Sequence, residues 1–128
     1  MQPITLTWPG GSHPFRLRLG ELRALQSARK AGPEEIYLRF HSGRWEADDL
    51  VQVIRWGLVG GGMAPDVAAT LVTPLIDLHP LVQFKLTAQA VLAHALFQVE
   101  DDQVGEDKGA TETPQENGAS PNSTVAAP

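Results

Sequence analysis

The feature that most constrains the fold is residues 45–72, where two helical patterns flank three consecutive glycines. In the first pattern, apolar residues follow the i, i+3, i+4, i+7, i+8 spacing that gives a helix one buried face: Leu50, Val53, Ile54, Gly57 and Leu58. The second pattern opens with a proline, which is favoured in the first turn of a helix. The stretch therefore predicts a helix, a break at residues 60–62, and a second helix.

The first of these helices is expected to begin at Glu46, because Trp45 and Leu50 then have the spacing of a hydrophobic staple. Two aspartates fall in its first turn, where negative charge is favourable. Gly57 lies inside the buried stripe, where it costs up to about 1 kcal/mol relative to alanine. A close approach by a neighbouring element would explain this glycine.

The segment before this stretch predicts a β-hairpin and two helices. Residues 4–8 and 15–19 alternate apolar and polar side chains and are separated by turn residues at 9–12. A lone hairpin is marginal in water, so its apolar face should lie on helices. The two helices are predicted from glycine and proline signals at their ends: residues 20–31, closed by Gly32, and residues 33–42, closed by Gly43.

Two further helices are predicted after the glycines. The fourth helix begins at Pro65 and should end at Pro74, with Val67, Ala68, Leu71 and Val72 facing inward. The last helix, residues 80–99, is apolar almost all round. One stripe holds Leu81, Phe84, Ala88, Val91, Leu92, Ala95, Leu96 and Val99, and the other holds Val82, Leu86, Ala90, Ala93 and Phe97.

Such a helix is either central in its fold or covered by a partner. Its predicted polar strip is narrow and contains Gln83, Thr87, His94 and Gln98. Together these elements predict an α+β fold, in which an N-terminal hairpin packs on a small bundle of four to five helices.

Charge divides the chain into two parts. Residues 1–99 carry nine basic and eight acidic side chains, a net +1, whereas residues 100–128 carry seven acidic side chains and one lysine, a net −6. The latter segment contains no aromatic residue, so it cannot bury enough apolar surface to offset the entropy of ordering. We therefore expect a single domain at residues 1–99 and a disordered acidic tail at residues 100–128.

Several kinds of site lack the residues that they need. The chain contains no cysteine, which excludes disulfides and cysteine zinc sites. Residues 60–62 follow a helix rather than a strand and precede no Gly-Lys-Ser/Thr, so a phosphate loop is not indicated. The histidines have no metal-binding spacing, and the adjacent acidic pairs suit helix starts better than catalysis. We therefore expect no enzyme activity, metal or cofactor.

The basic residues leave two alternatives at the hairpin. Arg16 and Arg18 share one predicted strand face and lie near Arg23, so they form either a solvated face or a weak nucleic-acid patch. The nearly neutral domain argues against dedicated nucleic-acid binding. No run of 18 apolar residues exists, and the N-terminus lacks the features of a signal peptide. We expect a cytoplasmic protein with neither a nucleic-acid nor a membrane partner.

The order of these patterns resembles a known family. The hairpin leads into FRLRLGELRALQ (residues 15–26), then DDLVQVIRWGLVGGG (48–62), the proline-led APDVAATLV (64–72) and a long apolar helix. This order is similar to that of small tail assembly chaperones of gene transfer agents and siphophage-like prophages. The resemblance extends over residues 4–99 and rests on packing residues and glycines.

The resemblance implies a protein that binds the helical tape measure protein and keeps it soluble until tail tube subunits polymerise. Such a chaperone acts in the bacterial cytosol and is not retained in the mature particle. The tail tube protein is a possible second partner, and the chain is a possible homo-oligomer. The candidate partner-binding surface combines Trp56, which lies off the buried stripe of its helix, with the second stripe of the last helix: Val82, Leu86, Ala90 and Phe97.

Two other functions remain open from the sequence. The first is a structural or head–tail connector protein of the virion, which would be found in purified particles. The second is a small nucleic-acid-binding regulator that uses Arg16 and Arg18. The tryptophans do not decide among these, because tryptophan is enriched at interface hot spots but is also common in cores.

Overall fold

A two-stranded hairpin and five helices make up residues 1–98, the part of the chain that the computed structural model describes. The predicted α+β class is confirmed. The predicted tail, residues 100–128, and the domain boundary at residue 99 lie outside the described residues. The elements are β1 (Ile4–Trp8), β2 (Gly11–Phe15), α1 (Leu19–Arg29), α2 (Pro33–Ser42), α3 (Ala47–Gly60), α4 (Pro65–Ile76) and α5 (Leu81–Phe97).

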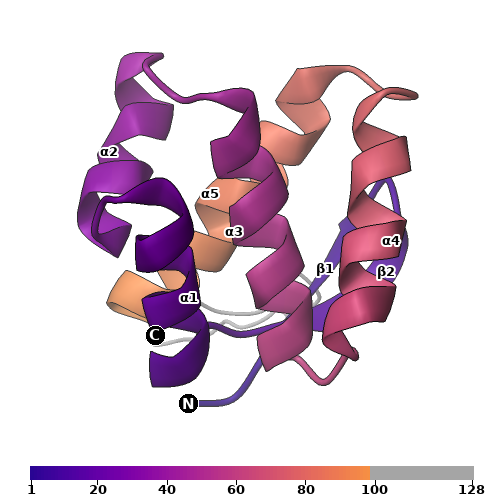
Figure 1. The fold of residues 1–128 in the computed structure, drawn as a ribbon, viewed down its shortest axis with the longest axis horizontal. Helices are drawn as coiled ribbons and strands as arrows, with labels where there is room; N and C mark the ends of the chain where they lie inside the picture. Colours follow the sequence, from indigo (N-terminus) through magenta and orange to yellow (C-terminus); the bar gives the residue numbers. More distant parts are fainter. Residues whose placement is uncertain (99–128) are drawn as a thin grey trace, which may run out of the picture.

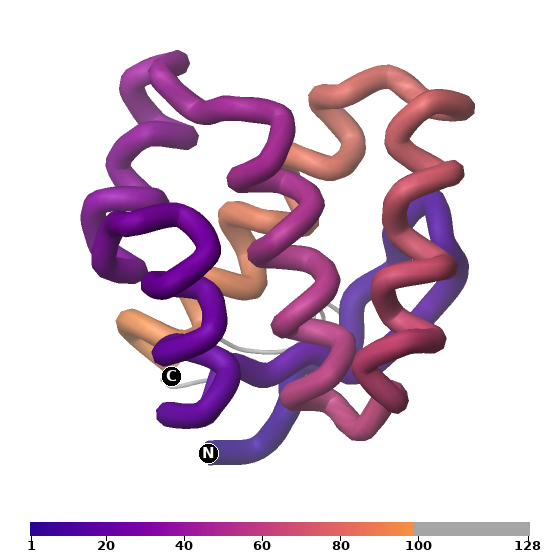
Figure 2. The backbone as a smooth tube through the Cα atoms, in the orientation of Figure 1, coloured from indigo at the N-terminus to yellow at the C-terminus, as the bar shows by residue number. Residues whose placement is uncertain are grey.

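Helix α3 is the centre of the arrangement. In Figure 1 it lies between α1 and α4, while α5 crosses behind it and the hairpin lies behind α4. It contacts α1, α4, α5 and β2, and the tube in Figure 2 shows that its neighbours come from both ends of the described chain. Its predicted apolar stripe is confirmed as core, because all five members are buried: Leu50, Val53, Ile54, Gly57 and Leu58.

The glycine in that stripe marks a close approach, as predicted. A Cβ atom at Gly57 would lie 3.0 Å from both Phe15 of β2 and Val91 of α5. The backbone at Gly57 also holds the segment after β2, because the Arg16 N–H donates to the Gly57 carbonyl at 3.0 Å. An alanine at this position would therefore require Phe15 or Val91 to move by a few tenths of an ångström.

The glycines at the end of α3 serve mainly in packing. A Cβ at Gly60 would lie 1.7 Å from the Arg16 carbonyl oxygen, and one at Gly61 would lie 2.0 Å from the Pro14 carbonyl oxygen. Only Gly62 has the positive φ, 121°, that favours glycine in the turn toward α4. The glycine run thus joins the end of α3 to the strand β2 and the segment that follows it.

The turn of the hairpin is shorter than the alternation predicts, so the second strand begins earlier. Trp8 pairs with Gly11 across a two-residue turn, so the second strand is Gly11–Phe15 and not residues 15–19. Gly11, at φ 119°, allows this tight turn. Beyond Phe15 the backbone turns to α3 instead of β1, as the bond from Arg16 to Gly57 shows.

The predicted end of α2 is confirmed and that of α1 is wrong, because only α2 ends at a glycine in the left-handed conformation. Helix α2 spans the predicted residues and ends at Gly43, whose φ is 77°. Helix α1, in contrast, ends at Lys30, which is itself left-handed, and not at Gly32. Gly32 instead has extended geometry as the N-cap of α2, because the residue before a proline is driven out of the helical region.

Helix α4 continues past Pro74, contrary to the prediction, and ends at Ile76. After the proline the chain tightens into i→i+3 hydrogen bonds, from Asp77 N–H to the Pro74 carbonyl and from Leu78 N–H to the Leu75 carbonyl. The predicted inward position of Val67 is also wrong, because its side chain is exposed. The helix contacts chiefly α3, so its buried stripe is narrow and includes Ala68 and Val72.

The predicted start of α3 is confirmed. Glu46 is the N-cap, and its backbone N–H donates to Asp49 Oδ2 at 2.8 Å. Trp45, just before it, is half-buried and stacks on Phe40 of α2, with ring centroids 6.2 Å apart. Leu50, in the next turn of the helix, is fully buried.

Candidate partner-binding site

Helix α5 has one buried and one exposed apolar face. Phe84, Ala88, Val91 and Leu92 are buried. On the other face, Val82, Leu86 and Phe97 are 56%, 63% and 64% exposed, and Ala90 and Ala93 are half-buried. We call these five residues the exposed stripe; at about 1.5 Å rise per residue it is about 22 Å long.

The exposed stripe faces away from α3. Val91 lies against Gly57 of α3, and the stripe lies about half a turn from Val91 around the helix. In Figure 1, α5 lies behind α3. One face of this helix is therefore central in the fold, and the other keeps three large apolar side chains exposed.

A groove runs beside the middle of the stripe, between β1 and α5. Its volume is about 510 Å³. Helix α5 contributes Gln83, Leu86, Thr87 and Ala90, and the hairpin contributes Leu6, Thr7, Trp8 and Pro9. Two of the predicted site residues, Leu86 and Ala90, thus form one wall of a concave apolar surface. Val82 lies one turn before Leu86 on the same helix.

Phe97 lies at the far end of the stripe, next to α2. Its ring meets the Tyr37 ring edge-on, with centroids 5.7 Å apart. The Tyr37 ring is held in turn by His41, at 4.6 Å between centroids. This contact fixes one edge of Phe97 while most of the side chain stays exposed.

The predicted polar strip of α5 is partly wrong, because Thr87 and His94 are buried. The Thr87 hydroxyl donates to the Gln83 carbonyl at 3.1 Å. His94 Nε2 lies 2.7 Å from the Gln2 carbonyl oxygen, which ties the N-terminus to the last turn of α5. These polar atoms reach backbone groups, and burial of a polar side chain is tolerated when it finds such partners.

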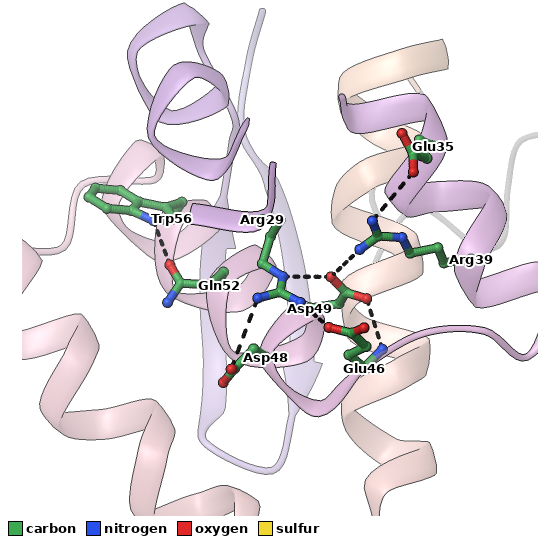
Figure 3. Close-up of polar contacts among 8 residues, drawn as sticks. All are labelled: Arg29, Glu35, Arg39, Glu46, Asp48, Asp49, Gln52 and Trp56. Carbon is green, nitrogen blue, oxygen red and sulfur yellow. Dashed lines mark hydrogen bonds and ion pairs between the residues drawn. The ribbon is translucent and has the colours of Figure 1, made fainter. Parts of the chain in front are cut away.

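Trp56, the remaining predicted site residue, lies on α3 and does not line the groove. Its indole N–H donates to Gln52 Oε1 at 3.0 Å (Figure 3). The Arg55 guanidinium lies over its ring at 4.8 Å from the centroid. The ring is half-buried and packs against the core, so the structure does not bring Trp56 together with the exposed stripe.

The charged residues gather at a different place, where α1, α2 and α3 meet. Asp49 is fully buried and accepts hydrogen bonds from Arg29 Nε at 2.7 Å and Arg39 Nη1 at 2.9 Å (Figure 3). The hydrogen bond with Asp49 is the main cause that raises the pKa of Arg29. We call Arg29, Arg39 and Asp49 the charged junction. Asp49 is thus a structural ion-pair partner, and its neighbour Asp48 is exposed.

The hairpin arginines are occupied by partners within the fold. Arg16 Nε donates to the Gly60 carbonyl at 2.9 Å, and Arg18 forms an ion pair with Glu21 at 3.1 Å. Burial raises the pKa of Glu21, but the hydrogen bonds and charge of Arg18 outweigh that effect and lower it overall. The Glu21 carboxylate offsets the charge of Arg18, and the bond to Gly60 holds the Arg16 guanidinium against the end of α3.

Two kinds of site find no support within residues 1–98. No group of three potential metal ligands comes together there. No helix in that range is long and apolar enough to span a bilayer.

The hairpin side of the groove is what the sequence does not reveal. Trp8 is buried in the core, yet it also lines the groove with Pro9. The sequence does predict that the apolar face of the hairpin lies on helices. That expectation does not say which helix is contacted.

Comparison with known proteins identifies the family. The family model described as phage tail tube protein, GTA-gp10, matches residues 2–98. The match includes most of the chain and all of its described elements, so the chain belongs to this family and is a phage or gene transfer agent tail-related protein. No curated protein and no solved structure matches it.

Proposed function

We propose that this member of the GTA-gp10 family is a tail assembly chaperone that binds helical segments of the tape measure protein on the exposed stripe of α5. The observation that carries the proposal is the exposure of Val82, Leu86 and Phe97 on one face of α5. Contiguous exposed apolar surface of this kind is typical of a binding site. The proposal also agrees with the tail-related family.

The stripe has the form needed to receive an amphipathic helix. Apolar residues on one face of a client helix, at i, i+3, i+4 and i+7, would lie along it in the helix-in-groove mode. Full burial of one leucine or phenylalanine stabilises by about 1.5–3 kcal/mol, and each of these side chains is already partly buried. The contact is therefore expected to be weak and reversible, as release of the client during tail assembly requires.

The remaining parts of the proposal follow from this role. Binding through apolar contacts requires neither catalysis nor a cofactor. A chaperone would act in the cytoplasm of the producing cell and be absent from the mature particle. The ion pair of Arg18 with Glu21 and the backbone contact of Arg16 with Gly60 disfavour the alternative of a nucleic-acid-binding regulator.

A structural protein of the tail is the second candidate function. It is favoured by the description of the matching family as a phage tail tube protein. Mass spectrometry of purified particles separates the two candidates. A tube or connector subunit should be present in many copies, whereas a chaperone should be absent.

The test of the proposal is co-expression with a tape measure protein from the same phage or gene transfer agent. The native chain should keep the tape measure soluble, and the double variant Leu86→Gln, Phe97→Gln should not. Leu38→Gln is the matched control, because Leu38 is a similarly exposed leucine on α2. Equal solubility with the double variant and the native chain would reject the stripe as the client site.

A further inference from the structure

We infer that the exposed stripe of α5 also binds the same stripe of a second copy of this chain, in an antiparallel dimer whose twofold axis passes at Ala90. The dimer itself does not depend on the proposed function. Its consequence, that self-association competes with the client, rests on that function.

The order of side-chain sizes along the stripe is self-complementary. Large residues lie toward its ends, Val82 and Leu86 on one side and Phe97 on the other, and small residues, Ala90 and Ala93, lie between them. A twofold axis at Ala90 places Leu86 of each copy beside Ala93 of the other. Small residues at the crossing allow two helices to approach at the short end of the usual 8–10 Å range.

The same axis directs Phe97 toward the groove. In an antiparallel pair centred on Ala90, Phe97 of one copy lies beside Gln83 of the other, and Gln83 lines the groove with Leu86 and Trp8. The groove volume is about 510 Å³, and a cavity of about 150 Å³ already holds a benzene ring. Each copy therefore offers both an aromatic side chain and a groove for one, as an isologous interface requires.

Charge favours the antiparallel arrangement over a parallel one. Lys85 is the only Lys, Arg, Asp or Glu within α5, and it does not belong to the stripe, so the contact itself opposes no like charges. Residues 100–128 carry a net −6 and follow closely on the end of α5. Antiparallel pairing starts these two acidic segments at opposite ends of the contact, whereas parallel pairing would start them together.

The size of the contact makes the dimer weak. Stable interfaces bury about 1,200–2,000 Å² in total, with about 20–30 residues on each side. The stripe and the groove offer far fewer residues than that, so the contact belongs with weak interfaces. A weak dimer shields the stripe at high protein concentration. It dissociates when a client helix competes for the same surface.

Single cysteines test the geometry, because the chain contains none. Two helix axes about 8–10 Å apart, each with Cα atoms at a radius of about 2.3 Å, bring the two Ala90 Cα atoms to about 4–5 Å, within disulfide reach. Val82 is eight residues from the axis, so its two copies are about 24 Å apart. Val82→Cys is therefore a matched control that is more exposed than Ala90→Cys.

We expect Ala90→Cys to form disulfide-linked dimers under mild oxidation roughly tenfold faster than Val82→Cys. Sedimentation velocity of the native chain should show concentration-dependent dimers, which Phe97→Gln weakens. Equal rates for the two cysteine variants, or no dimer from a folded Ala90→Cys chain, would overturn the inference. Circular dichroism establishes that each variant is folded.

A tape measure segment, added in the same assay, separates this inference from the proposed function. Slower cross-linking of Ala90→Cys in its presence supports competition for one surface. If cross-linking remains selective for Ala90→Cys but the segment has no effect, the dimer stands and the proposed client site is rejected.

Discussion

The charged junction of α1, α2 and α3 and the exposed stripe of α5 differ in which side chains they bury. The junction buries a charged side chain, whereas the stripe exposes apolar ones. At the junction, Asp49 is fully buried and two guanidinium groups bind it. On the stripe, Leu86 and Phe97 are more than half exposed, although they are among the most apolar side chains of the fold.

The difference separates what fixes the fold from what can bind a partner. A buried carboxylate bound by two guanidiniums accepts few rearrangements, because loss of the carboxylate removes the partner that both guanidiniums share. Apolar contacts on a helix face are less directional, so the stripe can accept different helices. Substitutions that lower the free energy of unfolding should therefore concentrate at the junction and at the glycines of α3. Substitutions that weaken partner binding should concentrate on α5.

The largest effect is expected from Asp49→Ala. It leaves Arg29 and Arg39 without their shared carboxylate, and breaking a buried ion pair in this way costs about 3–5 kcal/mol. The free energy of unfolding in urea measures the loss. Asp48→Ala removes an exposed carboxylate that lies 4.0 Å from Arg29, and loss of such a surface ion pair should cost at most about 1 kcal/mol. Equal losses for the two variants would show that the junction is not a structural centre.

Gly60→Ala should rank second, at about 1–3 kcal/mol of destabilisation. The added methyl group would lie 1.7 Å from the Arg16 carbonyl oxygen, so the backbone of α3 or of the segment after β2 must shift. Gly20→Ala is the contrast, because no atom lies within 4 Å of its added Cβ and alanine favours helices. The melting temperature of each variant measures the effect. A Gly60→Ala protein with the native melting temperature would contradict the tight contact.

The double variant Leu86→Gln, Phe97→Gln should change the free energy of unfolding by less than about 1 kcal/mol, because both side chains are largely exposed. Its loss should instead be seen in tape measure solubility. Urea unfolding and the co-expression assay together test this separation. If the double variant unfolds the domain, the stripe belongs to the core and the contrast with the junction disappears.

The smallest effect is expected from Glu21→Gln and depends on pH. Because the folded pKa of Glu21 is lowered from 4.5, its stabilising effect is present above that pH and is lost as pH falls through the folded pKa. The native chain should therefore lose more stability than the variant on acidification below about pH 4.5. Unfolding curves of both proteins at pH 6 and pH 3 give the loss of unfolding free energy for each protein. Equal losses for the native chain and the variant would exclude a contribution from Glu21.

The fold could be predicted where local chemistry determines it. Helix α2 follows from Pro33 at its start and Gly43 at its end, and the core stripe of α3 follows from its spacing. The second strand could not be predicted in the same way. Residues 15–19 alternate as a strand should, but the Arg16 N–H binds the Gly57 carbonyl instead, a contact between residues distant in sequence.

The candidate site could be predicted in part for the same reason. Helical periodicity alone places Val82, Leu86 and Phe97 on one face, and the structure finds that face exposed. Periodicity cannot say that Trp56 is half-buried beside Gln52 and Arg55. Nor can it show that Trp8 and Pro9 form the other wall of a groove, because that depends on how the hairpin packs on α5.

The contact between Gly60 and the Arg16 carbonyl also has a consequence for how related sequences can diverge. Two backbones touch there without intervening side chains, so compensating substitutions cannot adjust the contact. We expect family members to retain glycine at positions 60 and 61 even where most of the sequence has changed. The stripe is under no such constraint, and we expect it to vary in step with the partner that each relative binds.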